Sequence, residues 1–258
     1  MKQTVADAAF GAQGQTLAEA AGLIAALMQD PGLRDPALRW LVQPADAFSG
    51  DAVAARRTPS GRLLAMLADA TGHGLAAAGN LLPALRMFYA QAQQDQPVGA
   101  VAREINRCLQ SAGRTGRFVA AVVVEIEADG QRAAVWNGGM PAGLWLHEQG
   151  EMAAALHPQH PPLGILPDAQ FDSTSARLDA GAGGHLLFFS DGLLEAVGRA
   201  GEAFGVQRVR THALAGGAAE APGRVHSAVR AHLGGARAVD DISMLMIDLG
   251  MIDPGRAP

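Results

Sequence analysis

The sequence predicts an α+β fold in which two mostly antiparallel sheets stack on each other and are flanked by helices. Two observations carry this prediction. The expected elements come in runs (a hairpin, two helices, several strands, two helices, a final strand) and not in the βαβ alternation that builds a parallel sheet. Short turns such as Thr58-Pro59-Ser60-Gly61 and Asp129-Gly130 join neighbouring strands, as in hairpins.

Hydrophobic periodicity and turn residues place the individual elements. We expect strands at 38–42, 51–57, 63–68, 118–127, 132–136, 171–178, 186–189 and 242–249, with a further hairpin around 148–150. Helices are expected at 75–93, 98–110, 202–214 and 221–233. Trp136 and Trp145 are expected to pack between the sheets.

The N-terminal segment precedes this core. Thr16 and Glu19 form a capping box, and apolar residues from Leu17 to Leu27 mark one face of a helix that Asp30-Pro31-Gly32 ends. Two interpretations stay open: a helix packed on its own domain, or a linker that dimerises or transmits a signal. We therefore divide the chain into a tail and amphipathic helix (1–40), a main domain (41–250) and a C-terminal tail (251–258).

The composition limits the classes of function and partner that this chain can have. The chain has 258 residues, of which 49% are hydrophobic, and a formal net charge of -5, which argues against nucleic acid or an anionic membrane as a partner. It contains no apolar run of about 18 residues and no signal peptide, so we expect no membrane insertion and a cytoplasmic location. The single Cys108 excludes an internal disulfide framework.

Lys2 is the only lysine in the sequence. P-loop enzymes, protein kinases and Schiff-base enzymes all need a lysine inside the fold, so these classes are excluded. A GxSxG nucleophile motif is also absent.

The most informative stretch runs from Leu63 to Ala78. An apolar strand ends at Asp69, and Ala70-Thr71-Gly72-His73-Gly74 then forms a glycine-rich loop before a helix. Because the preceding strand is the other arm of a hairpin, Asp51 at its start is expected to lie near Asp69.

Four acidic positions lie at strand ends: Asp51, Asp69, Asp191 and Asp240, with Asp241 beside the last. Carboxylates that converge without lysines repel one another unless hard divalent cations neutralise them, and all-oxygen ligation suits Mg²⁺ or Mn²⁺. Two such ions can activate a water and stabilise charge on a phosphoryl group. The alternative is that each aspartate merely caps a turn.

Seven motifs occur in order over about residues 44–249. They are Gly50-Asp51, Asp69-Ala-Thr-Gly-His-Gly74, Trp136-Asn-Gly-Gly-Met-Pro141, Pro162-Leu-Gly164, Ser190-Asp-Gly-Leu-Leu-Glu195, Phe204-Gly205 and Asp240-Asp-Ile-Ser243. Together they resemble the SpoIIE/RsbU branch of the PPM (type 2C-like) metal-dependent protein phosphatases.

The resemblance implies a four-layer α-β-β-α sandwich that hydrolyses phosphoserine or phosphothreonine through a water activated by two Mn²⁺ or Mg²⁺ ions, with a third ion as an open alternative. Asp69 would bridge the metals, with the Ala70 carbonyl as a ligand. Asp191 and Asp240 would complete the first metal site, and Asp51 would bind the second metal, directly or through water. Asp241 ranks below Asp240 as a ligand.

His73 has two interpretations, a proton donor to the leaving serine oxygen or a structural loop residue. Met140 stands where the family commonly has His. The arginine that binds phosphate in eukaryotic relatives has no match before Asp51, and Arg39, Arg56 and Arg57 are unranked substitutes. His157 and His160 are expected to lie in a surface turn.

By the same likeness, the substrate would be a phosphorylated anti-sigma-factor antagonist in bacterial partner switching. A catalytically silent PPM-like binding or sensor module is the alternative. An aspartyl phosphotransferase is excluded because Phe189 stands two residues before Asp191, where a second aspartate is required. A homodimer through the N-terminal helix and a receiver or sensor domain elsewhere are further expectations.

Overall fold

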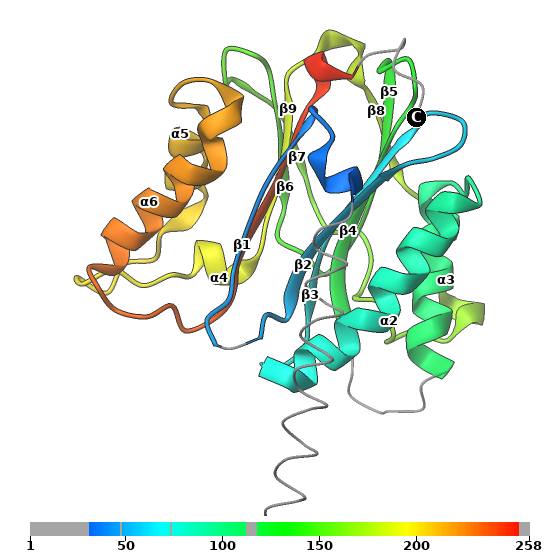
Figure 1. Ribbon diagram of the computed structural model, residues 1–258, viewed down its shortest axis with the longest axis horizontal. Coiled ribbons are helices and arrows are strands. Elements are labelled where there is room, and N and C mark those ends of the chain that lie inside the picture. Colours follow the sequence, from blue (N-terminus) through cyan, green and yellow to red (C-terminus); the bar gives the residue numbers. More distant parts are fainter. Residues whose placement is uncertain (1–30, 47, 73, 112–117, 253–258) are drawn as a thin grey trace, which may run out of the picture.

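Two five-stranded antiparallel sheets lie face to face in the computed structural model, which describes residues 31–46, 48–72, 74–111 and 118–252 (Figure 1). Over these residues, sheet A has the strand order β1-β10-β9-β6-β7 and sheet B the order β2-β3-β4-β5-β8. Sheet A contains β1 (Leu38–Gln43), β6 (Gly143–Leu146), β7 (Met152–Leu156), β9 (His185–Phe189) and β10 (Ile242–Asp248). Sheet B contains β2 (Asp51–Arg57), β3 (Leu63–Ala70), β4 (Val119–Ile126), β5 (Arg132–Gly138) and β8 (Ala176–Asp179).

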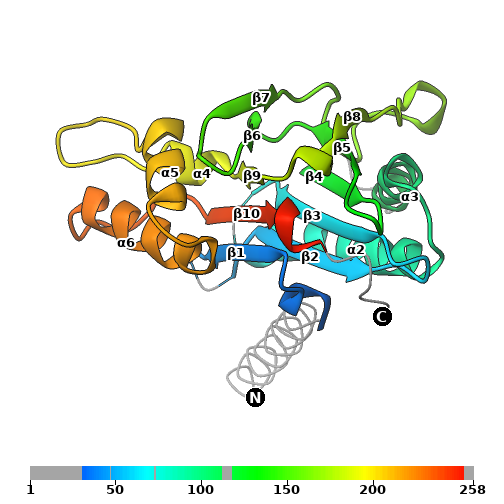
Figure 2. The same ribbon diagram turned by 90° about the horizontal axis from the view of Figure 1, so that it is seen from above.

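Helices cover both outer faces, which confirms the predicted α-β-β-α sandwich (Figures 1 and 2). The helices α2 (Gly74–Gln93) and α3 (Val98–Ser111) pack on sheet B, and α5 (Gly205–Leu214) and α6 (Ala221–Leu233) pack on sheet A. Short helical turns complete the chain: α4 (Asp191–Leu194) and 3-10 turns at Pro31–Arg34, Asp168–Gln170, Ala180–Ala182, Ala218–Glu220 and Leu249–Met251. None of the helices described here is both long and apolar enough to cross a membrane.

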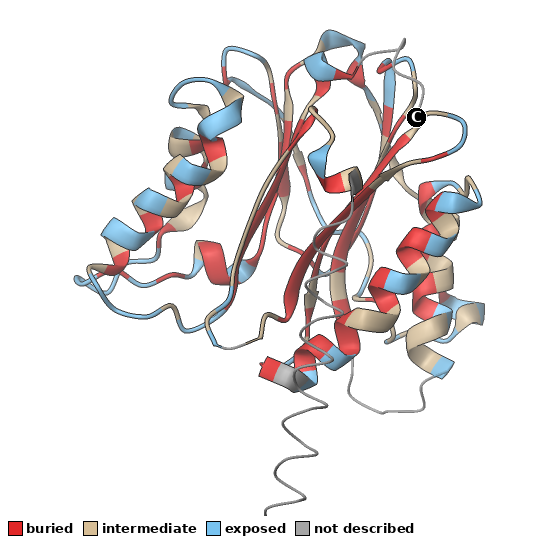
Figure 3. Ribbon diagram, viewed as in Figure 1, coloured by how far each residue is buried: buried red, intermediate tan, exposed pale blue. Residues whose placement is uncertain are grey.

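Three apolar layers hold the sandwich together, and Figure 3 shows them as buried strips along the strands and along the inner faces of the helices. Because successive strand residues point to opposite faces, each strand contributes alternately to two layers. In β3, Leu63, Ala65 and Leu67 lie between the sheets. Leu64 and Met66 face α2 and α3. The same alternation decides on which face of its sheet each polar residue at a strand end lies.

Several predicted boundaries were wrong. The strand expected at 171–178 is only Ala176–Asp179, because Phe171 turns into the layer below α3 and Asp172 forms a turn by accepting the backbone N–H of Thr174. The helix expected from residue 202 begins at Gly205, since Ala203 instead forms an isolated bridge with Val197.

Trp136 was expected between the sheets but lies on the other face of β5, in the layer against the helices. Its indole Nε1 donates to the carbonyl of Asp172. Trp145 does pack against the layer between the sheets, as predicted.

The N-terminal helix predicted from Thr16 lies outside the described residues. The described part of the chain begins with the 3-10 turn Pro31–Arg34, where Leu33 is buried in the apolar layer between the sheets. Arg57 at the end of β2 forms an ion pair with Asp35 (2.7 Å), which fastens this segment to the edge of sheet B.

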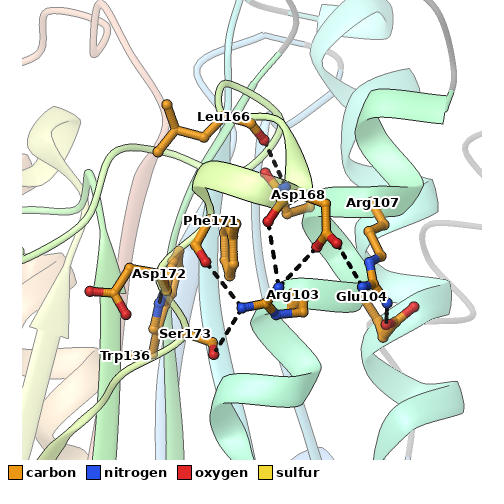
Figure 4. A network of polar contacts seen from close by, with 10 residues as sticks. Arg103, Glu104, Arg107, Trp136, Leu166, Asp168, Phe171, Asp172 and Ser173 are labelled. Carbon is orange, nitrogen blue, oxygen red and sulfur yellow. Dashed lines mark hydrogen bonds and ion pairs between the residues drawn. The ribbon is translucent and has the colours of Figure 1, made fainter.

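A polar network joins the segment that follows Pro162 to α3 (Figure 4). Asn106 is fully buried, accepts the N–H of Gly164 (2.8 Å) and donates to the carbonyl of Leu166 (2.9 Å). Arg103 donates to Asp168 and to the carbonyl of Phe171. These bonds satisfy backbone groups beyond Leu163, which itself pairs with Val119 of β4 in an isolated bridge.

We expect Asn106→Ala to destabilise the protein by about 1 to 3 kcal/mol, because it leaves a partly buried N–H and a partly buried carbonyl without partners. Arg107→Ala is the matched control. It removes ion pairs of a half-exposed side chain with Glu104 and Asp168, and should cost less than about 1 kcal/mol. Urea unfolding of both variants measures the difference in their free energies of unfolding. Equal losses of stability would show that the hydrogen bonds of Asn106 stabilise the protein no more than the ion pairs of Arg107.

Candidate metal-dependent active site

Asp51 and Asp69 lie directly opposite each other at one end of sheet B. They are register partners in the β2–β3 hairpin. Both continue the row of residues that face the other sheet, since Val53 on β2 and Leu67 on β3 belong to the layer between the sheets. The prediction that the hairpin brings these two carboxylates together is confirmed.

Sheet A contributes the facing wall. Ser190 follows β9 and Ser243 lies in β10, each on the inward-facing row of its strand. The two are bonded to each other: Ser190 N–H donates to the Ser243 carbonyl, and Ser243 N–H donates to Ser190 Oγ, both at 3.0 Å. These hydroxyls lie beside Asp51 and partly offset the rise in its pKa.

Asp191 and Asp240 lie at the rim of the same end. Asp191 opens α4, and Asp240 lies just before β10; both side chains belong to exposed residues. A Cβ on Gly192 would lie 2.1 Å from the Asp241 carbonyl oxygen, so the two segments touch. This end is the lower one in Figure 1, where α4, the start of β2 and the start of α2 converge.

The loop between β3 and α2 closes the site on the side of sheet B. Ala70 N–H donates to the Gly50 carbonyl, and Thr71 N–H donates to the Phe118 carbonyl. Gly72 and Gly74 adopt φ of 94° and 63°, which glycine reaches without strain. His73 lies outside the described residues, so its two interpretations stand as they were.

Burial and neighbouring carboxylates raise the pKa of Asp51 and that of Asp69. Burial, and then the charge of Asp69, raise the pKa of Asp51 well above its usual value. Burial, followed by the charges of Asp191, Asp240 and Asp241, raises the pKa of Asp69 to about 7. An unneutralised acidic pair is therefore costly at neutral pH.

The donor set fits a hard divalent cation. Asp51 is 3% exposed, and its Oδ2 atom has no hydrogen-bond partner among the described residues. Buried carboxylate oxygens without partners are rare because desolvation costs several kcal/mol, and a cation would supply the missing interaction. Asp51, Asp69, Asp191 and Asp240 offer only oxygen ligands, which suits Mg²⁺ or Mn²⁺.

The carboxylates do not yet converge on one point. Within the described part of the chain, no three His, Cys, Asp or Glu side chains stand in a ready-made metal arrangement. Asp191 Oδ1 accepts the N–H of Gly192 (2.7 Å), and Asp240 Oδ1 accepts the N–H of Asp241 (2.8 Å). Both residues are exposed, so these side chains have room to change rotamer.

The three substitute arginines are excluded as phosphate contacts at this end. Arg56 and Arg57 end β2, about 17 and about 20 Å along the strand from Asp51 at 3.3 Å per residue. Arg39 pairs with Met246 at the distal end of β10 and donates to the carbonyls of Pro36 and Leu38. The unranked prediction was wrong because it ignored how far a strand carries its residues.

The interpretation of His157 and His160 as a surface turn was half right. His157 is exposed, but the His160 side chain is only 6% exposed and stacks on Trp136 at 5.1 Å between ring centroids. Its Nε2 lies 2.9 Å from the Thr174 carbonyl oxygen. His160 is a packing residue of the segment before β8.

The sandwich with an acidic end belongs to a known structural class, the PP2C-type phosphatase fold. The SiaA-PP2C domain of Pseudomonas aeruginosa superposes with a TM-score of 0.76 and 19% identity, covering 93% of this chain and 98% of that one. The catalytic domain of the serine/threonine protein phosphatase PstP, solved in complex with two manganese ions, superposes with a TM-score of 0.58 and 19% identity, covering 82% of this chain and 97% of that one.

Residues 59–250 match the family described as Stage II sporulation protein E (SpoIIE), and the chain belongs to this family. The phosphoserine phosphatase RsbP of Bacillus subtilis (strain 168) is 28% identical over 152 residues. That match covers 57% of this chain and 37% of RsbP, so the chain corresponds to little more than a third of that relative. The resemblance inferred from the motifs is thereby confirmed.

The raised pKa values predict how the stability of the metal-free protein depends on pH. Because the folded-state pKa of Asp69 lies near 7 and the unfolded value near 3.8, this carboxyl stabilises the fold below about pH 4 and the contribution is lost as pH rises toward 7. In EDTA, wild type should therefore lose about 1 to 3 kcal/mol between pH 5 and pH 8.

Asp51→Asn removes one charge of the pair, so this variant should be more stable than wild type at pH 8 in EDTA, and the gain should shrink at pH 5. Denaturant unfolding at both values measures it, with the exposed Asp129→Asn as control. A metal-free Asp51→Asn less stable than wild type at pH 8 would contradict the account of carboxylate repulsion.

Proposed function

We propose that this chain is a Mn²⁺- or Mg²⁺-dependent protein serine/threonine phosphatase. The observation that carries the proposal is the buried, unpartnered Asp51 oxygen beside Asp69, at the end of the sandwich where Asp191 and Asp240 also lie. Structural roles alone do not account for this arrangement, because carboxylates that repel one another without a basic partner among the described residues destabilise the fold. Membership of the SpoIIE family and the activity named for RsbP support the same conclusion.

In this proposal, Asp69 and the Ala70 carbonyl would help to hold two ions, with Asp191 and Asp240 at the first and Asp51, directly or through water, at the second. When bound, such ions lower the pKa of a water to near neutrality and stabilise charge on the phosphoryl group. The residues of this chain orient the site: the β2–β3 register fixes Asp51 against Asp69, and the sheets exclude water from behind them. A third ion stays an open alternative.

For the substrate, we propose a phosphorylated anti-sigma-factor antagonist, acted on in the cytoplasm. The support is the likeness of the motifs to enzymes of bacterial partner switching. A homodimer through the N-terminal helix and control by a receiver or sensor domain elsewhere belong to the same proposal.

The first test is phosphate release from p-nitrophenyl phosphate and from a phosphoserine protein, with Mn²⁺, Mg²⁺ or EDTA. We expect metal-dependent release that EDTA abolishes. Asp191→Ala should lower kcat/KM by about 1,000-fold or more, because several kcal/mol of charge stabilisation correspond to at least that factor. The exposed Asp129→Ala is the control and should keep full activity.

Activity that survives EDTA would exclude the two-metal mechanism. No activity on either substrate, with Mn²⁺ still bound in calorimetry, would favour the catalytically silent binding module.

A second test separates the two interpretations of His73. Nitrophenolate is a good leaving group that needs no proton, whereas serine leaves well only when its oxygen is protonated. A proton donor is typically worth about 100- to 10,000-fold, so its loss would lower turnover of phosphoserine far more than that of p-nitrophenyl phosphate. We expect His73→Ala to change both rates by a similar factor, as for a structural loop residue. A selective loss on phosphoserine would show that His73 is the proton donor.

A further inference from the structure

Asp241 fastens the two sheets together at the acidic end. Its Oδ1 accepts the N–H of Ala45 (2.7 Å), and its Oδ2 accepts the N–H of Gly50 (2.5 Å). Asp241 precedes β10 of sheet A, whereas Gly50 immediately precedes β2 of sheet B. The side chain is therefore a clasp across the open end of the sandwich.

The clasp continues into the residues that face the site. Gly50 donates its N–H to Asp241, and its own carbonyl accepts the N–H of Ala70. The peptide that leads into Asp51 and the peptide of Ala70 are thus held in one chain of hydrogen bonds that starts at the Asp241 carboxylate. Such chains hold both the position and the direction of the groups they include.

The surroundings leave the clasp little freedom. Asp241 is 7% exposed. A Cβ on Gly50 would lie 2.9 Å from the Ala77 Cβ and 3.1 Å from the Ala70 carbonyl oxygen, so this position accepts only glycine without a shift. Asp241 is also held from behind, because Ser190 Oγ donates to its carbonyl (3.3 Å).

We propose that Asp241 is the positioning residue of the site: it sets Asp51 and the Ala70 carbonyl for the second metal ion and does not bind metal itself. This inference rests on the proposed function. Both Asp241 oxygens are already engaged by backbone N–H groups, whereas the neighbouring Asp240 is exposed and bonds only to the next N–H. Two adjacent aspartates thus have different tasks.

The test is Asp241→Asn, which keeps the shape but places an NH₂ group against one of the two backbone donors. We expect Mn²⁺ affinity measured by calorimetry to fall about 10- to 100-fold, the usual effect of losing a group that orients a ligand. The number of bound ions should be unchanged, and saturating Mn²⁺ should restore most of kcat on p-nitrophenyl phosphate.

Glu125→Gln is the matched control. Glu125 accepts the N–H of Val98 (2.8 Å) and so joins β4 to α3, at the end of sheet B away from the acidic site. This variant should lower the unfolding temperature and leave Mn²⁺ affinity within about twofold. Asp241→Asn with unchanged Mn²⁺ affinity and a similar loss of thermal stability would overturn the proposal, because the clasp would then be purely structural.

Direct ligation has a different signature. If Asp241 binds metal, the variant should lose one ion from the stoichiometry, and excess Mn²⁺ should not restore kcat. That result would also overturn the proposal.

Amide exchange decides the matter if Asp241→Asn does not fold or wild type binds no Mn²⁺. In metal-free wild type, the amides of Ala45 and Gly50 should exchange at least about 100-fold more slowly than unprotected amides. Fast exchange at both would show that the clasp does not form. Slow exchange in a wild type that binds no Mn²⁺ would refute the proposed function, and with it the metal-positioning role.

Discussion

The acidic end holds one costly arrangement on which the site depends: the buried Asp51 carboxylate lies directly opposite the partly buried Asp69 carboxylate, between the two sheets. Asp51 and Asp69 are direct register partners, and burial, followed by the charge of Asp69, raises the pKa of Asp51 well above its usual value. Folding alone would favour apolar residues here, as at Val53 and Leu67 one step further in. Among the residues that the structure describes, the arginines considered for the role lie at the distant strand ends, and Lys2 lies outside this part of the chain, so a cation from outside the chain would offset the repulsion of the pair.

The period of the β-strand explains how much of this site could be predicted from sequence. A hairpin that carries an acid at each open end must bring the two together, and strand alternation then decides that both face inward. The same reasoning found the strand ends at Phe189 and before Ile242, and with them Asp191 and Asp240. These are local patterns, so the sequence alone was sufficient to place these aspartates at strand ends.

Longer-range relations were not accessible in this way. The task of Asp241 depends on a contact with Gly50, which lies 191 positions earlier in the chain, and no local pattern signals it. The segment from Phe171 to Ser175 has strand-like composition, but Arg103 and a turn at Asp172 hold it in an irregular path. Trp136 was assigned to the wrong face because its strand lies against helices on one side and a sheet on the other, so both faces are apolar.

The acidic end is built from parts of unequal rigidity. Asp51 and Asp69 are fixed by the ladder of sheet B, and the Asp241 clasp joins that ladder to sheet A. Asp191 and Asp240 are exposed and hold only the N–H of the next residue, a bond that a small side-chain rotation releases. A rigid inner pair with adaptable outer carboxylates allows the fold to be completed before any ion is present. In the proposed function, this adaptability would let Asp191 and Asp240 approach an ion held by the inner pair.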